Sequence, residues 1–160
     1  MIGHCIAAFI ADPSLLTGAG LPESTCPVLR LSRRAALLPA GTELESALGI
    51  VPDPADDPFG EVFHSLTRPL ADWAQRLSVG GTVVYVETDY WGGSGTQSAM
   101  AWRDGTVRMA PMRGARGPIN AALRHLGVEP GSATDRFAAL GLDRYRSNDD
   151  WRSEGERVRG

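Results

Sequence analysis

The chain has 160 residues, of which 42% are hydrophobic, 22% are charged and 7% are aromatic. This length supports one domain with a hydrophobic core, and the composition excludes a coiled coil, a collagen-like chain and an array of repeats. All 16 basic residues are arginine. This excludes chemistry that needs a lysine, namely a Schiff base, a phosphate-binding P-loop or a pyridoxal-phosphate anchor.

Charge is unevenly distributed along the chain. The formal net charge is −3, but residues 1–100 carry 5 arginines and 11 acidic residues, whereas residues 101–160 carry 11 arginines and 8 acidic residues. The acidic balance argues against a dedicated nucleic-acid-binding protein, which is usually strongly basic. The asymmetry has two interpretations: a dipolar surface that binds a partner, or acids and arginines paired within one fold.

The cysteines and the N-terminal run bear on location. Cys5 and Cys26 are too few for a disulfide framework, and the sequence leaves the reactivity of either thiol open. We expect Cys5 to be buried and Cys26, which precedes a proline in a loop, to be exposed. The apolar run at residues 3–11 follows no basic segment and is too short to span a membrane. We therefore predict a cytoplasmic protein with reduced thiols and no membrane partner.

In the first half of the chain, apolar periodicity and turn residues predict three strands and two helices. The strands are expected at residues 3–11, 28–31 and 35–38, and the helices at residues 42–48 and 67–78. An acidic, proline-rich loop at residues 51–60 separates the two helices. The second helix carries Leu70, Trp73 and Leu77 on one stripe, which we expect to pack on a sheet.

The second half predicts a three-stranded meander followed by helices. Strands at residues 82–91, 96–103 and 106–110 are joined by a glycine-rich turn and by Asp104-Gly105, a two-residue hairpin signal. A helix opens at Gly117-Pro118, with proline in its first turn.

These elements predict a single α+β domain over residues 1–151. We expect a mostly antiparallel sheet with a three-stranded meander and helices packed on one face. Residues 152–160 are predicted to form a flexible C-terminal tail. The oligomeric state is left open.

The segment from Tyr85 to Gln97 has the densest chemistry in the chain. Strand alternation places Glu87 and Asp89 on one face, roughly 6–7 Å apart. This spacing suits an acid–base pair or a divalent cation with oxygen ligands. The alternative is a solvated polar face whose acids bond to arginines on the neighbouring strands, Arg103 or Arg108.

We take five residues of this segment as the candidate binding site: Glu87, Asp89, Tyr90, Trp91 and Gln97. The Gly92–Gly95 turn among them is either an anion-binding nest or a hairpin turn that needs positive φ angles. Catalytic residues are left unassigned, as is the question of whether the chain is an enzyme.

The rest of the sequence offers no motif for a cofactor or a metal. His4, His64 and His125 do not have metal-ligand spacing. The Gly-x-Ser-x-Gly nucleophile motif is also missing from the sequence. We therefore predict neither a metal nor a cofactor.

The core of the candidate segment resembles a group of small uncharacterised proteins from high-GC Gram-positive bacteria. Their shared core reads aromatic-Val-Glu-x-acid-aromatic-aromatic-Gly-Gly-x-Gly-x-Gln, which here spans Tyr85 to Gln97. The resemblance covers roughly residues 28–151. Members of the group carry histidines where this chain has Tyr145 and Ser147, which argues against a metal or acid–base role for that end. The group has no established activity, so the resemblance implies a bacterial domain and no particular reaction.

Two functions from different classes follow from these observations. The first is a bacterial binding protein of the immunity type, which neutralises a partner toxin; its acidic N-terminal part would suit a basic partner. The second is a small enzyme or ligand-binding domain that uses Glu87 and Asp89 beside the Gly92–Gly95 turn. A pocket lined by the aromatic residues and Gln97 would favour the second, and a flat apolar or acidic patch would favour the first.

Overall fold

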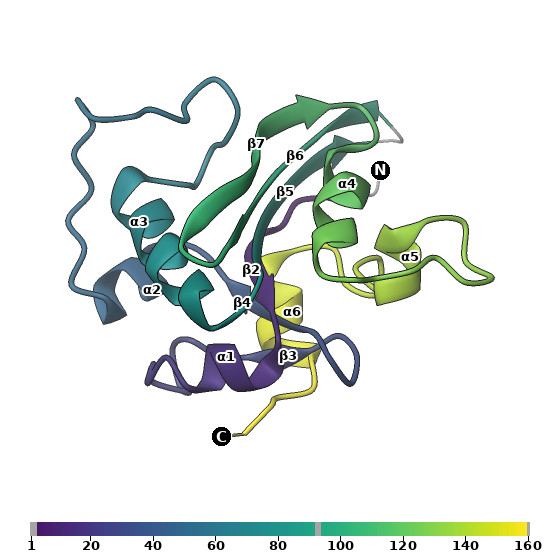
Figure 1. Ribbon diagram of the computed structural model, residues 1–160, viewed down its shortest axis with the longest axis horizontal. Coiled ribbons are helices and arrows are strands. Elements are labelled where there is room, and N and C mark those ends of the chain that lie inside the picture. Colours follow the sequence, from purple (N-terminus) through teal and green to yellow (C-terminus); the bar gives the residue numbers. More distant parts are fainter. Residues whose placement is uncertain (1–2, 92–93, 160) are drawn as a thin grey trace.

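The apolar run predicted as one strand over residues 3–11 forms two strands, β1 (Gly3–His4) and β2 (Ala7–Ala11). They belong to a computed structural model that describes residues 3–91 and 94–159 (Figure 1). From its second residue onward, every side chain of β2 is buried. A strand without polar side chains is stable only when both of its faces are covered, so other elements must pack on both sides of the sheet at β2.

The described part of the sheet contains seven strands, and every pairing between them is antiparallel. The other strands are β3 (Leu29–Arg30), β4 (Ala36–Pro39), β5 (Val83–Trp91), β6 (Ser94–Arg103) and β7 (Thr106–Gly114). Their order is β3-β4-β2-β5-β6-β7, and β1 pairs with the far end of β5. The predicted α+β class and the meander of β5, β6 and β7 are confirmed.

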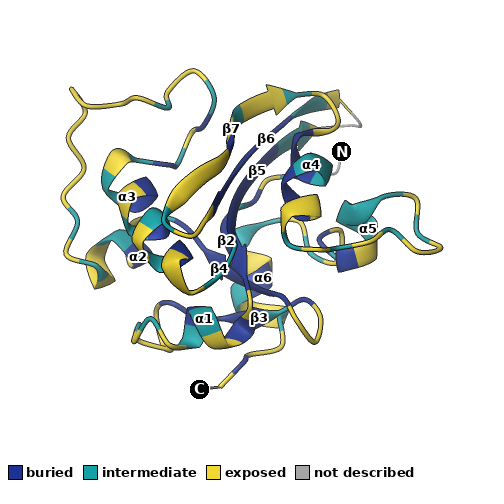
Figure 2. Ribbon diagram, in the orientation of Figure 1, coloured by how far each residue is buried: buried dark blue, intermediate teal, exposed yellow. Residues whose placement is uncertain are grey.

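Helices cover both faces of the sheet, which differs from the expected packing on one face (Figure 1). On one face lie α1 (Pro13–Thr17), α2 (Thr42–Ala47), α3 (Arg68–Leu77) and the short 3-10 helix η1 (Ser78–Gly80), and on the other lie α4 (Pro118–His125), α5 (Arg136–Leu140) and α6 (Asn148–Glu154). The central strands β2 and β5 are buried along most of their length (Figure 2). Their alternate residues enter two cores: Phe9 and Tyr85 enter the first, and Ile10 and Val84 enter the second. Strands that are apolar on both sides require both layers.

The helix predicted at residues 67–78 is present as α3. It begins where Thr67 Oγ1 accepts a hydrogen bond from Leu70 N–H (3.4 Å). Leu70 is buried, whereas Trp73 is partly buried and meets the ring of Phe9 edge-on, with 5.3 Å between ring centroids. The apolar stripe therefore covers the first core. No helix among the described residues is long and apolar enough to cross a membrane.

The C-terminal segment differs from the predicted flexible tail at residues 152–160. α6 extends into it, and Trp151 on this helix is fully buried against the ring of Tyr145, with 4.7 Å between ring centroids. Val158 is also buried, while Gly160 lies outside the described residues. Isolated apolar residues in a polar stretch produce no periodicity, which is why the sequence pattern does not reveal this packing.

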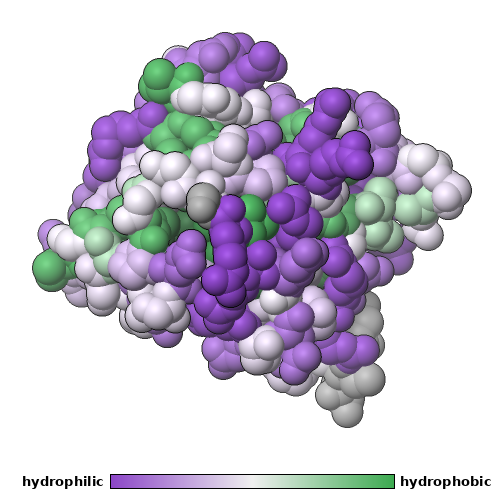
Figure 3. Space-filling view, turned by 90° about the horizontal axis from the view of Figure 1, so that it is seen from below, coloured by the Kyte–Doolittle hydropathy of each residue, from purple (hydrophilic) through white to green (hydrophobic). Residues whose placement is uncertain are grey.

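Backbone hydrogen bonds hold the same segment along the edge strand β3. Arg30 N–H donates to the Glu156 carbonyl (2.7 Å), and Val158 N–H donates to the Val28 carbonyl (2.8 Å). This pairing closes one edge of the sheet. The C-terminus lies at the bottom of the view in Figure 1, and Figure 3 shows the molecule from that side. Hydrophilic side chains gather over the middle of this face.

Deleting residues 155–160 should lower the free energy of unfolding by about 2–4 kcal/mol, because two backbone hydrogen bonds and the buried side chain of Val158 are lost. Urea denaturation followed by tryptophan fluorescence measures the change. Deleting residues 159–160 alone is the control and should leave stability unchanged, because both hydrogen bonds remain. Equal stability of the longer deletion and the full chain would contradict a packed C-terminal segment.

Candidate functional site

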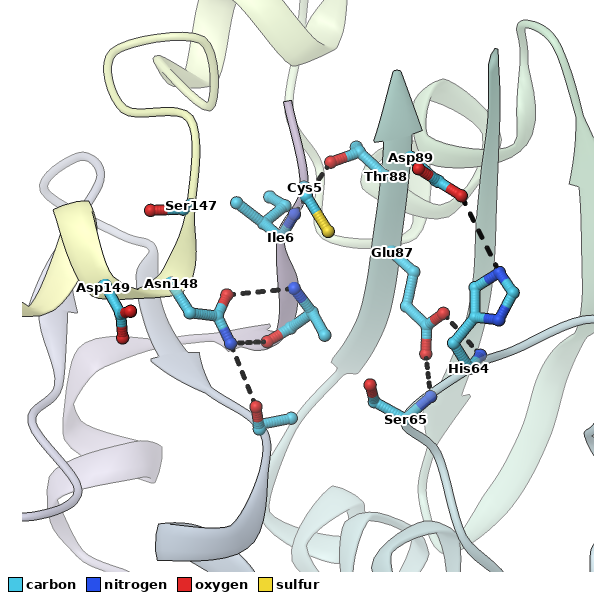
Figure 4. Close-up of a pocket in the computed structure, with 12 residues that line it drawn as sticks. Cys5, Ile6, His64, Ser65, Glu87, Thr88, Asp89, Ser147, Asn148 and Asp149 are labelled. Atoms are coloured by element: carbon cyan, nitrogen blue, oxygen red, sulfur yellow. Dashed lines mark hydrogen bonds and ion pairs between the residues drawn. The ribbon is translucent and has the colours of Figure 1, made fainter. Parts of the chain in front are cut away.

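A cleft opens where the polar end of β5 passes the interruption between β1 and β2 (Figure 4). Its volume is about 480 Å³. One wall is the loop that holds His64 and Ser65, and the opposite wall is the start of α6. The residues that line the cleft are Cys5, Ile6, Ala7, Ala40, His64, Ser65, Glu87, Thr88, Asp89, Ser147, Asn148 and Asp149.

Glu87 is the buried carboxylate of the cleft. Only 5% of the residue is exposed, yet each carboxylate oxygen has a donor. Oε1 accepts a hydrogen bond from His64 N–H (2.7 Å), and Oε2 accepts one from Ser65 N–H (2.9 Å). Oε2 also accepts a hydrogen bond from the Tyr85 hydroxyl (2.6 Å). These donors replace the water that the charge loses on burial, and they tie the loop before α3 to the sheet.

Tyr85 completes this arrangement from inside the first core. Its fully buried ring packs against the rings of Phe9 and Phe63, with centroid distances of 4.9 and 5.1 Å. Burial, followed by the nearby charge of Glu87, raises the pKa of the Tyr85 phenol well above its usual range. The phenol therefore stays protonated and serves as a donor to Glu87.

Asp89 lies two residues further along β5 and also lines the cleft. Its side chain is 47% exposed, and its Oδ2 lies 4.0 Å from Nε2 of His64, whose side chain is 64% exposed. The two acids predicted as a pair therefore have different environments. Glu87 is held by donors from the fold, whereas Asp89 is accessible from the cleft (Figure 4).

The arginines considered as alternative partners of these acids lie beside another residue. Arg103 Nε and Arg108 Nη2 are 3.8 and 3.4 Å from Asp104 Oδ2, at the turn between β6 and β7. The carboxylates of the cleft therefore face neither of these two cations, in contrast to the solvated ion-pair interpretation of the segment.

Cys5 contributes a thiol to the cleft, where the sequence analysis expected a buried side chain. Cys5 is exposed and Cys26 is buried, the reverse of the expectation, and both thiols are free. The strand interruption next to Cys5 accounts for its exposure. Partial burial raises the pKa of Cys5, and the charges of Asp89 and Glu87 raise it further. A raised pKa keeps the thiol protonated and disfavours it as a nucleophile.

The wall formed by α6 is held in place by the side-chain amide of Asn148. Its Oδ1 accepts a hydrogen bond from Ala7 N–H (3.0 Å), and its Nδ2 donates to the carbonyls of Ala7 (2.9 Å) and Ala40 (3.0 Å) (Figure 4). The amide thus makes the two hydrogen bonds with the backbone of Ala7 that a residue on a neighbouring strand would make. This pairing fixes Ser147 and Asp149 beside the cleft.

Of the five candidate residues, Tyr90, Trp91 and Gln97 do not line the cleft. The Tyr90 hydroxyl donates to the Ala115 carbonyl (2.7 Å) and accepts a hydrogen bond from Gln97 Nε2 (2.8 Å). Gln97 Oε1 accepts a hydrogen bond from Ile119 N–H (2.7 Å) at the start of α4. Tyr90 and Gln97 therefore position α4 on the second face of the sheet.

Trp91 is 59% exposed, and its indole lies over Gly3, its partner in β1. Gly92–Gly93 fall outside the described residues, so the nest interpretation of this turn stays a prediction. Gly95 has a φ of +152°, and a Cβ there would collide with the Asp89 carbonyl. This close approach of two backbones requires glycine at that position.

Several lining residues were not part of the sequence-based site, among them His64, Asn148 and Asp149. One local signal could have revealed the α6 wall. Ser147 accepts a hydrogen bond from Asp150 N–H (3.1 Å), and serine followed by an acid three residues later is typical of a helix start. Within residues 3–91 and 94–159, no group of three or more His, Cys, Asp or Glu side chains is arranged to hold a metal ion.

His4 links β1 to β5 and to the chain after α5. Its Nδ1 lies 2.7 Å from Thr88 Oγ1, and its Nε2 lies 3.1 Å from the Leu142 carbonyl. A carbonyl only accepts, so Nε2 carries the proton and Nδ1 accepts from the Thr88 hydroxyl, whose oxygen also accepts from Ile6 N–H (3.0 Å). Burial lowers the pKa of His4, and the hydrogen bond to Leu142 opposes this shift.

Comparison of the chain with protein-family models, with curated proteins and with solved structures found no match.

Glu87→Gln should lower the free energy of unfolding by about 2–3 kcal/mol, because it removes the buried charge and sets an amide donor against a backbone donor. Asp89→Asn, the same chemical change two residues along β5, should alter stability by less than about 0.5 kcal/mol. Urea denaturation of both variants provides the comparison. Equal effects of the two substitutions would show that the hydrogen bonds of Glu87 do not stabilise the loop.

Acidification should destabilise the protein through His4. The pKa of His4 is lower in the folded chain than its ordinary value of about 6.5, so the unfolded chain binds the proton more readily. The stabilising contribution is complete above about pH 6.5 and is lost as the pH falls below that value. Between about pH 7 and pH 5, the unmodified protein should therefore lose more stability than His4→Gln. The same loss in both proteins would remove His4 from the pH dependence.

Proposed function

We propose that this chain is a binding protein whose cleft receives a positively charged group of a protein partner. The observation that carries the proposal is the charge of the cleft. Its lining, all within the described residues, includes Glu87, Asp89 and Asp149 and no arginine, and the nearby Arg152 lies 3.5 Å from Asp149 alone of these three. A cleft lined by one sign of charge concentrates the field that it exerts on an incoming ion. A guanidinium or ammonium side chain is the matching group.

Two further features support a site for a cation. The raised pKa of the Cys5 thiol follows in part from the charges of Asp89 and Glu87, which is the effect of a negative potential inside the cleft. The walls are also built in advance, because Glu87 fixes one and Asn148 fixes the other. A preformed site binds without the cost of ordering its own side chains.

The biological setting is part of the same proposal. We place the protein in the bacterial cytoplasm, where the free thiols of Cys5 and Cys26 would remain reduced. The partner in this interpretation is a basic protein, and an immunity-type role, in which the partner is a toxin, is consistent with an acidic binding site.

The alternative is a small enzyme that uses Glu87 and Asp89 as acid and base. In its favour, both carboxylates line the cleft beside the His64 imidazole. The binding function is favoured because both oxygens of Glu87 already accept hydrogen bonds from the fold. A general acid or base needs an oxygen within reach of its substrate.

Fluorescence anisotropy with a labelled peptide of six arginines tests the proposal. The unmodified protein should bind the peptide with an affinity that falls as salt is added. Asp89→Asn should weaken binding about fivefold, the equivalent of roughly 1 kcal/mol for one partly exposed ion pair.

Asp57→Asn, in the acidic loop at residues 51–60, is the matched control for loss of one exposed charge. It should leave the affinity unchanged. If both variants weaken binding equally, the peptide is attracted by net charge alone and the cleft is not its site.

A further inference from the structure

The two edges of the sheet differ. The β3 edge is covered by the C-terminal segment through the hydrogen bonds of Arg30 and Val158. The strand at the other edge is β7, and within the described part of the chain no strand pairs with its outer side. Most of its nine residues are exposed (Figure 2). An open edge presents unpaired N–H and C=O groups, to which an extended segment can add as a further strand.

β7 also presents apolar side chains to solvent. Val107 is 47% exposed and Met112 is 46% exposed. Val107 lies opposite Trp102, which belongs to the first core, and Met112 lies opposite Ala99, which belongs to the second. Within residues 106–110, Val107 therefore offers an apolar side chain on the face of the first core, against which a side chain of an added strand can pack.

Arginine dominates the charge of this edge. Between residues 103 and 116 the chain has one acid, Asp104, and four arginines, Arg103, Arg108, Arg113 and Arg116. Arg108 lies 3.4 Å from Asp104, and Arg113 donates to the backbone carbonyl of Glu61 (3.3 Å), a contact that does not neutralise its charge. The edge as a whole is positively charged, in contrast to the acidic cleft.

We infer that the outer edge of β7 is the docking site for an extended, acidic segment of a protein partner, which adds to the sheet beside residues 106–110. Opposite charges on neighbouring strands attract, so carboxylates on the segment would face Arg108 and the arginines around it. This surface is separate from the cleft, and the inference does not depend on the function proposed for the cleft.

A second copy of this chain fits the edge less well. β7 carries Arg108 and Arg113 and no acidic residue, so pairing one β7 with another brings only like charges together. Pro111 has no N–H to donate, and a proline on an edge strand limits indiscriminate pairing. It also confines the added segment to the part of β7 before it.

Fluorescence anisotropy with a labelled peptide of alternating valine and glutamate tests the inference. The unmodified protein should bind this peptide, and Arg108→Glu should weaken binding about fivefold or more. Arg124→Glu makes the same charge change on the exposed side of α4 and should leave binding unchanged. An equal loss in the two variants would overturn the inference, because net charge alone would then account for binding.

A second measurement separates strand addition from charge attraction. The same peptide methylated at alternate backbone nitrogens keeps its charge but loses the N–H groups that would donate hydrogen bonds to β7. It should therefore bind at least tenfold more weakly. With the intact peptide bound, amide hydrogen exchange over residues 106–110 of the unmodified protein should slow. Equal binding of the two peptides, or unchanged exchange, would overturn the inference. Dimerisation of the protein through residues 106–110 would also overturn the inference, because the strand added at this edge would then come from a second copy of the chain.

Discussion

The buried carboxylate of Glu87 connects the sheet to the loop that shapes the cleft. A charge removed from water costs several kcal/mol unless donors in the protein replace the lost hydration. Here the donors are the backbone N–H groups of His64 and Ser65 and the hydroxyl of Tyr85. Because two of them belong to the loop, the bonds that compensate the charge also fix the path of the chain into α3. That helix in turn covers the first core with Leu70.

Glu87 and Asp89 are chemically similar acids, but they differ in burial and therefore in role. Glu87 is almost fully buried and stabilises the architecture, whereas Asp89, two residues along the same strand, faces the cleft beside His64. The sheet then separates two charged surfaces. The acidic cleft lies at the end of β5, and the arginine-rich edge lies on β7, two strands away. Under the two binding proposals, the molecule would engage a basic and an acidic segment at two separate places, an arrangement that improves specificity more than raw affinity.

The elements that could be predicted from the sequence are those with local signals. The hairpin signal Asp104-Gly105 and strand alternation predict the meander, and they also bring Glu87 and Asp89 to one face. The start of α6 also has a local signal in Ser147 and Asp150, but its place beside the cleft could not be predicted, because His64 and Asn148 come from distant segments that no spacing links. The structural role of Glu87 is equally hidden, since two of its three donors are backbone N–H groups, which carry no residue-type signal. The helices on both faces follow from strands such as β2, which have no polar side, but which helix covers which face depends on the pairing of the strands.

Amide hydrogen exchange at His64 and Ser65 in the unmodified protein tests the role of Glu87 most directly. If the carboxylate holds these two N–H groups, they should exchange as slowly as the paired amides of β5, although they belong to a loop. The exposed amides of Val51, Asp53 and Asp57, which donate no hydrogen bond within the described part of the chain, supply the rate expected without such bonds. Exchange of His64 and Ser65 at that faster rate would contradict the account, because the wall of the cleft would then not be fixed to the sheet.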